Sequence, residues 1–260
     1  MTDHMKKIFL FAAAIVLAAA STSNAQFTAT IAGGPHDLSN GSAIRNSDST
    51  INGQTCVFCH VPHGGSPSVP LWNRANPTGA AYQVYTSSTM NAVATGAGIA
   101  SGMSGACMSC HDGTIAMDVV TNVNGLPFGT GSTGGSVAFT AGPNKKATYS
   151  NGTGGSANLM SGGMPFLGSD LRNDHPVAIT YQTVQTADPG HYMPVTQVGA
   201  RIYINGAAGQ LPLYGTATAN ATVECSSCHD SHNNSLNGTS GGFLRMANTG
   251  SQMCKTCHNK

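Results

Sequence analysis

The eight cysteines of this 260-residue chain fall into four pairs of one kind. In every pair two residues separate the cysteines, and a histidine directly follows the second cysteine. The resulting C-x-x-C-H motifs are Cys56/Cys59/His60, Cys107/Cys110/His111, Cys225/Cys228/His229 and Cys254/Cys257/His258. Because no cysteine lies outside these motifs, one chemistry must account for all eight thiols.

The spacing within each motif suits the covalent attachment of haem. C-x-x-C-H is the attachment signature of c-type haem. Two thiols three residues apart can reach the two vinyl groups of one porphyrin, and the adjacent imidazole then lies under the iron. The sequence therefore predicts four covalently bound haem c groups, with the four motif histidines, His60, His111, His229 and His258, as proximal iron ligands.

Three other uses of paired cysteines fit the sequence less well. Zinc sites are often built from two C-x-x-C pairs, but zinc does not require a histidine after each pair. A redox-active dithiol would occur once, near a βαβ pattern. A disulfide framework is plausible in an exported protein, but it would not place a histidine after every second cysteine. The fourfold repeat of the whole motif favours haem.

A six-coordinate haem iron needs a second axial ligand, and the histidines outside the motifs supply the candidates. His4 lies in a segment that we expect to be removed, which leaves five histidines for four distal positions. The number of available histidines is therefore close to the number of distal positions if every haem has two histidine ligands. We predict four distal ligands and expect His191 to be the surplus residue; the four are His36, His63, His175 and His232.

His63 and His232 occupy equivalent places, three residues beyond the proximal histidines of the first and third motifs. Residues three apart on a helical turn share a face, so each trailing histidine would lie on the proximal side of its own porphyrin. Its imidazole must then serve a different haem, which would bring haems into close pairs. A surface or supporting role is the alternative for both residues.

His36 and His175 lie in turn-rich segments, each beside an aspartate that could orient its ring. Methionine is the other possible axial ligand, and Met108 and Met117 near the second motif are the candidates. A methionine ligand raises the haem potential relative to a second histidine. Four haems with two histidine ligands each would therefore be low-spin, low-potential centres, which suits electron relay more than catalysis at an open iron.

The composition indicates that the cofactors must organise the fold. The chain contains 33 glycines, and only 8% of its residues are charged and 6% aromatic. Such a chain buries little apolar area and needs a further source of stability. We predict a haem-centred fold that is mostly irregular, with short helices after the haem motifs and a few short strands. A helix continuing from the second motif through residues 112–120 is one example.

Residues 1–25 are predicted to be a signal peptide. Lys6 and Lys7 precede an apolar run at 8–20, and Ala25 ends a small-x-small cleavage site. The run is shorter than the roughly 20 residues that a membrane-spanning helix needs. We therefore predict export with cleavage and no membrane span after processing, a membrane anchor being the alternative. Haem attachment outside the cytoplasm agrees with export.

The remaining residues, 26–260, are predicted to form a single tetrahaem domain. An N-terminal arm at 26–55 carries His36, and residues 56–120 hold the first two haems. A Gly/Ser-rich surface segment follows at 121–163, with short strands near 137–140 or, alternatively, disorder. Residues 164–260 hold distal ligands and the last two haems, with strand patterns within 176–215. The formal net charge of +1 provides no basic field for nucleic acid.

Several stretches resemble the multihaem cytochrome c family of metal-reducing bacteria. They are residues 34–39 (GPHDLS), 56–64 (CVFCHVPHG), 71–74 (LWNR), 110–114 (CHDGT), 174–177 (DHPV), 224–230 (ECSSCHD) and 243–245 (FLR). The resemblance spans most of residues 34–258. It is greatest to the tetrahaem extracellular cytochromes of the OmcE type, which polymerise into conducting filaments.

The resemblance implies two histidine ligands on every haem and one distal histidine donated by an adjacent subunit. His36 is then the candidate donor, with ligation inside one chain as the alternative. It also implies an electron carrier rather than an enzyme, located outside the cell or on its surface. Its partners would be other copies of itself, other multihaem cytochromes and extracellular electron acceptors. The alternatives are a monomeric periplasmic or outer-surface electron shuttle and a multihaem reductase with an open haem.

Overall fold

The computed structural model describes the chain in a series of segments. They are residues 31–32, 34–39, 45–46, 55–65, 69–79, 82–117, 119–121, 135–136, 140–141, 147–150, 159–163, 165–204, 211–233 and 243–259. The predicted signal peptide and the strand centre at 137–139 lie outside these segments. Within them, no helix is both long enough and apolar enough to cross a membrane.

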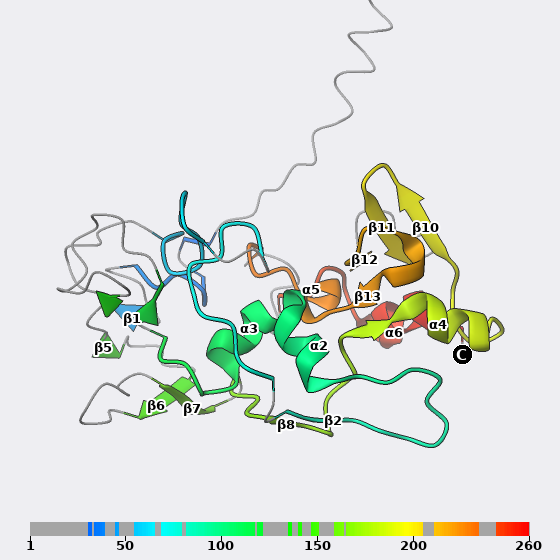
Figure 1. Ribbon diagram of the computed structural model, residues 1–260, viewed down its shortest axis with the longest axis horizontal. Helices are drawn as coiled ribbons and strands as arrows, with labels where there is room; N and C mark the ends of the chain where they lie inside the picture. Colours follow the sequence, from blue (N-terminus) through cyan, green and yellow to red (C-terminus); the bar gives the residue numbers. More distant parts are fainter. Residues whose placement is uncertain are drawn as a thin grey trace, which may run out of the picture.

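The helices are short, and those that contain cysteines belong to the motifs (Figure 1). Helix α3 carries the second motif and packs on α2, from which the extended residue Gly102 separates it. Helix α5 spans the two cysteines of the third motif and α6 contains those of the fourth, and His229 and His258 directly follow these helices. The α-helices are α2 (Gly96–Ser101), α3 (Met103–His111), α4 (Tyr181–Ala187), α5 (Cys225–Cys228) and α6 (Gln252–Cys257), and the 3-10 helices are η2 (Thr218–Asn220) and η3 (Thr249–Ser251).

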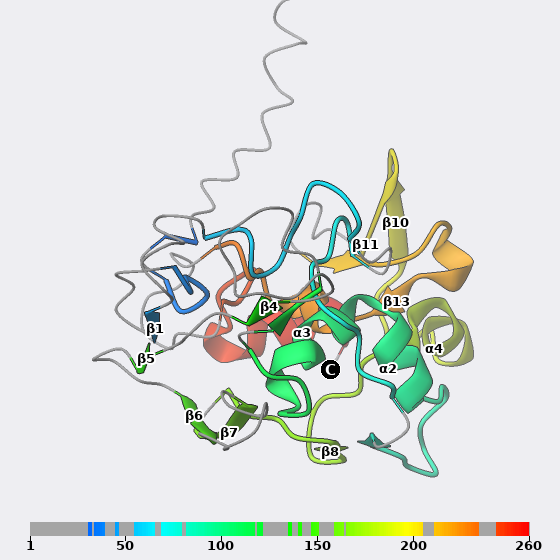
Figure 2. The ribbon, with the colours of Figure 1, turned by 60° about the vertical axis from the view of Figure 1, so that its left-hand side comes forward.

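The largest sheet in the described part of the chain is antiparallel and has the order β10-β11-β12. Its strands are β10 (Val195–Val198), β11 (Arg201–Ile204) and β12 (Pro212–Leu213). A two-residue turn joins β10 to β11, and Gly199 in that turn has a φ of 61° that glycine adopts without strain. The β10–β11 hairpin projects from the body of the described residues in both Figure 1 and Figure 2.

The other strands form two-stranded ladders, most of them two residues long. Among the described ladders, only the pair β2–β8 is parallel. It joins Gln83–Val84 to Asp170–Leu171, so segments on either side of the second motif lie together. The remaining pairs are β1 (Arg45–Asn46) with β5 (Thr140–Ala141), β3 (Val119–Val120) with β4 (Gly135–Ser136), β6 (Ala147–Ser150) with β7 (Leu159–Gly163), and β9 (Ile179–Thr180) with β13 (Thr222–Val223).

Buried apolar side chains form small separate clusters, and several adjoin motif cysteines. Cys59 packs against the cluster of Val69, Trp72 and Ala106. Cys257 packs against two further clusters, which consist of Tyr181, Ile202, Ile204, Leu213 and Ala221 and of Leu211 and Met246. The chain is thus low in regular structure, which is compatible with a fold built around cofactors.

The prediction that helices follow the motifs is wrong, because the helices end at them. Helix α3 stops at His111, α5 at Cys228 and α6 at Cys257. After α3, Asp112 Oδ1 accepts a hydrogen bond from the Thr114 amide at 2.8 Å, and Gly113 has a φ of 73°. This turn ends the helix, so residues 112–117 do not continue it, and Val119–Val120 form β3.

Candidate haem sites

Each motif places its cysteines and histidine on one side of a helical turn. The carbonyl of the first cysteine accepts the amide of the proximal histidine at 2.8 Å in the first motif, 3.0 Å in the third and 2.9 Å in the fourth. The second motif lies inside α3. Residues at positions i and i+3 share one helical face, so the two cysteines of a motif lie on the same side, and the hydrogen bond to the histidine amide keeps the histidine next to them although His229 and His258 are themselves extended.

A second chain segment clamps the proximal histidine of the first motif. His60 forms an antiparallel bridge with Trp72. The Asn73 amide donates to the Cys59 carbonyl at 2.8 Å, and the Val61 amide donates to the Leu71 carbonyl at 2.9 Å. We call this pair of hydrogen bonds around a bridged histidine the backbone clamp.

The same backbone clamp recurs at two further motifs. At the third, His229 bridges Leu244, with the Arg245 amide on the Cys228 carbonyl and the Asp230 amide on the Phe243 carbonyl. At the fourth, His258 bridges Tyr192, with the Met193 amide on the Cys257 carbonyl and the Asn259 amide on the His191 carbonyl. The sequence shows a repeat only at the motif level, whereas the structure extends the repeat to the clamping segments.

The proximal imidazoles of the first two motifs have their Nδ1 atoms engaged. His60 Nδ1 lies 2.9 Å from the Pro70 carbonyl oxygen, and His111 Nδ1 lies 2.6 Å from that of Pro165. A carbonyl oxygen only accepts, so Nδ1 carries the proton and the Nε2 lone pair is available. This is the tautomer in which a supporting hydrogen bond orients an imidazole toward a metal.

Two predicted distal ligands show the same arrangement. His175 Nδ1 lies 2.9 Å from the Pro176 carbonyl oxygen, and His36 Nδ1 lies 3.3 Å from that of Ser231. The predicted orienting role of the neighbouring aspartates is wrong for His36, since Asp37 accepts instead from Ser39. Backbone carbonyls therefore support these rings.

Within the described residues, three motif histidines each lie near one histidine from outside the motifs. The ring centres are 6.0 Å apart for His60 and His232, 6.2 Å for His111 and His36, and 6.4 Å for His258 and His175. A metal–imidazole bond is about 2 Å long, and the bonding nitrogen lies about 1 Å from the ring centre. Two imidazoles that share one metal ion therefore have centres about 6 Å apart, as these pairs do.

The donor set fits haem better than zinc. A structural zinc site needs four tetrahedral protein ligands, and the described residues contain no group of three or more His, Cys, Asp or Glu side chains that could hold a metal ion. A pair of imidazoles would instead supply two ligands to an iron ion and leave the others to the nitrogens of a porphyrin.

All eight predicted attachment cysteines lie within the described segments, and none of them forms a disulfide. The exposed ones are the first cysteines of the first and fourth motifs, Cys56 and Cys254. The half-buried ones are Cys59, Cys107, Cys110, Cys225, Cys228 and Cys257. All eight thiols are thus free in the structure.

Burial favours the uncharged forms of these groups. Desolvation, with a smaller contribution from His111, lowers the pKa of His36 to about 4. Desolvation likewise holds the pKa of His111 below its usual value, which favours the neutral form of the imidazole that can bind a metal. Burial raises the pKa of Cys59 and of Cys257 to about 12, which favours neutral sulfur over the thiolate that zinc requires.

Thiols of different motifs also lie near one another, which the sequence did not predict. Cys110 of the second motif adjoins Cys59 of the first and, after burial, is the next cause of the raised pKa of that thiol. A hydrogen bond from Cys107 to the Cys225 sulfur raises the pKa of Cys107 and lowers that of Cys225. From the sequence, both cysteines of the second motif were expected to bind the second haem alone. In the structure, Cys110 lies near Cys59 of the first motif and Cys107 near Cys225 of the third. Attachment of the second haem by these two cysteines stays a prediction.

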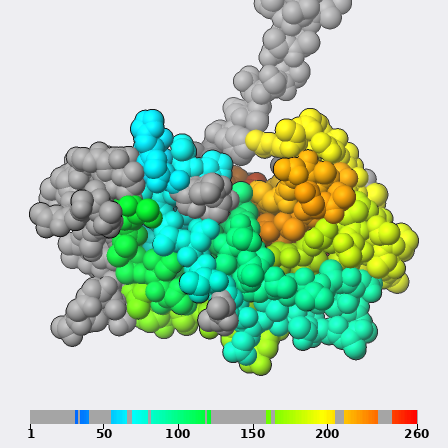
Figure 3. Space-filling model, in the orientation of Figure 1, coloured from blue at the N-terminus to red at the C-terminus, as the bar shows by residue number. Residues whose placement is uncertain are grey.

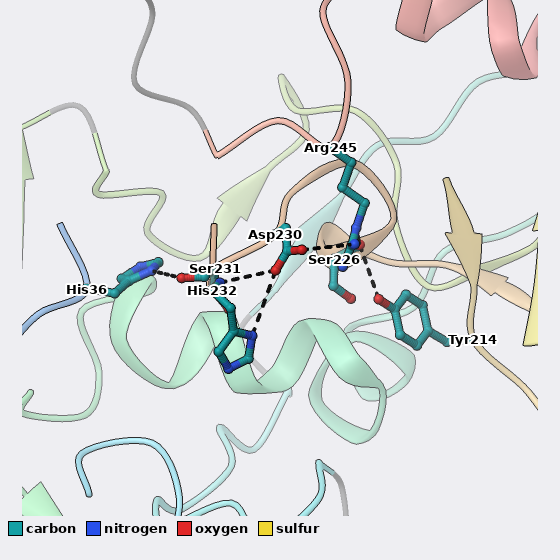
Figure 4. A network of polar contacts seen from close by, with 7 residues as sticks. All are labelled: His36, Tyr214, Ser226, Asp230, Ser231, His232 and Arg245. Carbon is teal, nitrogen blue, oxygen red and sulfur yellow. Dashed lines mark hydrogen bonds and ion pairs between the residues drawn. The ribbon is translucent and has the colours of Figure 1, made fainter. Parts of the chain in front are cut away.

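The turn formed by Asp230, Ser231 and His232, hereafter the 230–232 turn, touches more than one imidazole (Figure 4). His232 is the residue whose ring lies against His60 of the first motif. The Ser231 carbonyl accepts from His36, which in turn lies against His111 of the second motif. The turn directly follows the third motif. One short segment after the third motif therefore contacts an imidazole of the first motif and supports the imidazole that lies against the second.

Asp230 links the turn to Arg245. Its Oδ1 accepts from the His232 amide at 3.1 Å, and its Oδ2 accepts from Arg245 Nη1 at 3.3 Å. Arg245 Nε donates to the Ser226 carbonyl at 2.7 Å, and the Tyr214 hydroxyl donates to the same carbonyl at 3.2 Å. Figure 4 shows these contacts as one continuous polar network.

A buried glutamate ties the second motif to the third. Glu224 Oε2 accepts from the Ser104 amide at 3.1 Å and from the Ser104 hydroxyl at 2.5 Å, at the start of α3. The Ser104 hydroxyl in turn accepts from the Cys225 amide at 3.0 Å. In Figure 3 the teal residues around α2 and α3 adjoin the orange residues of the segment that contains α5.

Sequence reasoning gave no role to Glu224 or Arg74, although both lie in stretches that resemble multihaem cytochromes. The guanidinium of Arg74 is buried and donates to the carbonyls of Met117, Ala116 and Ser109, so it holds the end of α3 against the loop that follows. Charged residues are rare in this chain, so each of them was a candidate for a specific structural role. A charge that is buried needs specific partners.

The other candidate ligands lie as follows. His63 is in an exposed turn after the first motif. His191 is exposed, and its Nδ1 lies 2.8 Å from an Asp188 carboxylate oxygen. Met108 and Met117 are buried, and Met108 packs with Ile99 and Leu171 in an apolar cluster, so packing accounts for its burial.

The helical argument for His232 rests on a wrong premise. His229 is extended, with φ −108° and ψ 142°, so the chain has left the helix before it reaches His232. The extended backbone carries His232 away from its own motif and toward His60 of the first.

The C-terminal part of the chain, residues 218–260, matches a family model described as a doubled CXXCH motif. This match indicates a multihaem c-type cytochrome. The matched segment contains the third and fourth motifs, and the same five-residue pattern recurs at 56–60 and 107–111. A comparison with curated proteins finds no match. Covalently bound c-type haem and electron transport follow from the motif, although some multihaem cytochromes are enzymes.

Proposed function

We propose that this multihaem cytochrome binds four haem c groups and functions as an electron carrier. The observation that supports this most is the set of three imidazole pairs with centres 6.0 to 6.4 Å apart, each joining a motif histidine to a non-motif histidine. The haem irons would supply one-electron exchange between the ferric and ferrous states. Imidazoles on both sides would keep substrate from the iron, which favours a carrier over a reductase.

The pairs suggest which histidine serves which haem. His60 and His232 would hold the first haem, His111 and His36 the second, and His258 and His175 the fourth. His63 is then assigned to the third haem with His229. The first and third motifs share the backbone clamp and a trailing histidine, so the approach of His232 to the first motif argues for a reciprocal approach of His63 to the third.

The haem count and spin state test this proposal. The mature protein should have the mass of the polypeptide plus four haems, and its ferric electron paramagnetic resonance (EPR) spectrum should contain only low-spin signals. Fewer than four haems would contradict the cofactor count. A high-spin ferric signal in the native protein would instead favour the reductase with an open iron.

We further propose that the protein is exported through residues 1–25 and delivers electrons outside the cell or on its surface. Extracellular electron acceptors, other multihaem cytochromes and other copies of the chain are its proposed partners. The resemblance to OmcE-type cytochromes supports a filament, whereas the position of His36 against His111 of the same chain favours a monomeric shuttle. Negative-stain imaging of secreted protein separates the two, because only the filament gives long uniform fibres.

A further inference from the structure

We propose that Asp230 and Arg245 are positioning residues that set the redox potential of the iron held by His60 and His232. This inference rests on the proposed function, because it concerns the ligand environment of one proposed haem. It assigns the two residues opposite effects: Asp230 lowers the potential of that iron, and Arg245 raises it.

The first step is a difference among the candidate ligands whose ring partners are described. His36, His60, His111 and His175 each have a neutral backbone carbonyl at Nδ1. His232 faces a carboxylate instead, since the Oδ1 atom of the aspartate two residues before it lies 3.8 Å from its Nδ1. Of these five predicted iron ligands, only His232 has a carboxylate rather than a carbonyl beside its Nδ1. His191, the expected surplus histidine, also has one, from Asp188.

The second step is the effect of this anion. At 3.8 Å the Asp230 carboxylate lies beyond hydrogen-bond distance of the His232 Nδ1, so it acts on the ligand through its charge. The ferric state carries one more positive charge than the ferrous state, so a nearby anion stabilises it. Asp230 should therefore lower the midpoint potential of this haem relative to one whose ligands face carbonyls.

The third step concerns Arg245, which binds the other oxygen of the same carboxylate. Its Nη1 lies 3.3 Å from Asp230 Oδ2, and the side chains are only 17% and 10% exposed, respectively. Two anchors hold Arg245 in place, a bond from Nε to the Ser226 carbonyl at 2.7 Å and one from its amide to the Cys228 carbonyl at 2.8 Å. Limited exposure weakens solvent screening, so the guanidinium counteracts the carboxylate.

The competing explanation is that the pair only shapes the 230–232 turn, since Asp230 also accepts the His232 amide. A structural role predicts that removing either residue loosens His232 and has the same effect. A charge effect predicts shifts of opposite sign. The sign of the two shifts therefore separates the explanations.

The experiment uses the holoprotein and its Asp230→Asn and Arg245→Gln variants. Midpoint potentials are measured by redox titration while the EPR signals of the individual haems are followed. Asp230→Asn should raise the potential of one haem, and Arg245→Gln should lower the potential of that same haem. Arg245→Lys keeps the charge and should leave the potential closest to wild type.

Asp170 and Arg172 provide a matched control. They form an ion pair at 2.6 Å with side chains that are 51% and 61% exposed, respectively. Asp170→Asn and Arg172→Gln should leave all four potentials unchanged. Shifts of the same sign in Asp230→Asn and Arg245→Gln, or no shift in either, would overturn the inference. Failure of the proposed function has a different signature, namely missing haems or high-spin iron in the wild-type protein.

Discussion

Prolyl carbonyls orient three of the imidazoles in the described segments, those of His60, His111 and His175. The pyrrolidine ring of proline fixes its φ angle, so the backbone around a prolyl carbonyl is stiffer than around other residues. The acceptors, which are the carbonyls of residues 70, 165 and 176, therefore hold the Nε2 atoms in preset directions. A ligand whose direction is fixed before the metal arrives loses less conformational entropy on binding.

The first prediction concerns His232. His232→Ala should leave four haems attached, because covalent attachment depends on the motif cysteines, but it should remove one axial ligand. A high-spin ferric signal that amounts to one haem per chain should appear in the EPR spectrum. His191→Ala is the control, since the exposed His191 ring pairs with a carboxylate, and its spectrum should stay low-spin. A low-spin spectrum for His232→Ala would refute the assignment.

The haem-attachment chemistry of the motifs was predictable from the sequence, but the pairing of motif histidines with histidines outside the motifs was not. C-x-x-C-H reports local spacing, which the sequence displays directly. The contact of His36 with Ser231 joins residues 195 positions apart, and no local pattern encodes it. The approach of Cys110 to Cys59 is likewise a three-dimensional fact, because the two cysteines belong to separate motifs.

Helix α3 depends on a residue far along the chain for its N-terminal hydrogen bonds. Gly102 at its start has no side chain to cap it, and Glu224 supplies the missing acceptor. A carboxylate there also interacts favourably with the positive end of the helix. The segments of the second and third motifs are thus stabilised together.

The second prediction follows from this cap. Glu224→Ala should lower the free energy of unfolding by about 1–3 kcal/mol, because donors at Ser104 and Thr222 lose their acceptor. Glu224→Gln keeps an acceptor and should cost less. Thermal unfolding of the holoproteins, followed by Soret-region circular dichroism, measures both. An Ala variant as stable as wild type would show that Glu224 contributes nothing.

Helix boundaries were the part of the local structure that sequence reasoning placed wrongly. The run after the second motif, DGTIAMDVV at 112–120, has enough apolar residues for a helix, but the Asp112 turn and the positive φ of Gly113 stop it. The backbone clamp was equally invisible. Its partner residues Trp72, Leu244 and Tyr192 are of different types and lie at different separations from their motifs.

The molecule as a whole has dispersed apolar clusters, and the proposed haem sites lie among them. The 230–232 turn makes the first, second and third proposed sites depend on one another. It contacts imidazoles of the first and second sites, and it directly follows the third motif. The fourth site is separate in this respect, since its clamp and its second imidazole come from residues 175–193.

The third prediction tests that interdependence. Replacing Cys225 and Cys228 by alanine removes the attachment of the third haem and should disturb the 230–232 turn. The first and second haems should then lose ligation and show high-spin signals. Replacing Cys254 and Cys257 by alanine is the matched control, and it should leave these two haems low-spin. Equal spectra from the two double variants would contradict a special role for the third site.

Composition alone anticipated a fold low in regular structure, because a chain with 33 glycines and few aromatic residues cannot build one large core. It could not anticipate where the small clusters would form. That depends on which distant segments the clamps bring together, for example Tyr192 and His258, which Tyr181 also joins through its hydroxyl to the Met193 and Cys257 carbonyls.

The span between His60 and its partner ring in the 230–232 turn affects the order in which a nascent chain matures. The clamp around His60 closes as soon as residue 73 has emerged, because both of its hydrogen bonds lie within residues 59–73. The turn that carries His232 emerges much later, and closing so long a loop is slow. If haem is attached while the chain is being exported, the first haem would be anchored with one coordination site open to peroxide or carbon monoxide, and protection from such reagents would come only when the 230–232 turn has followed.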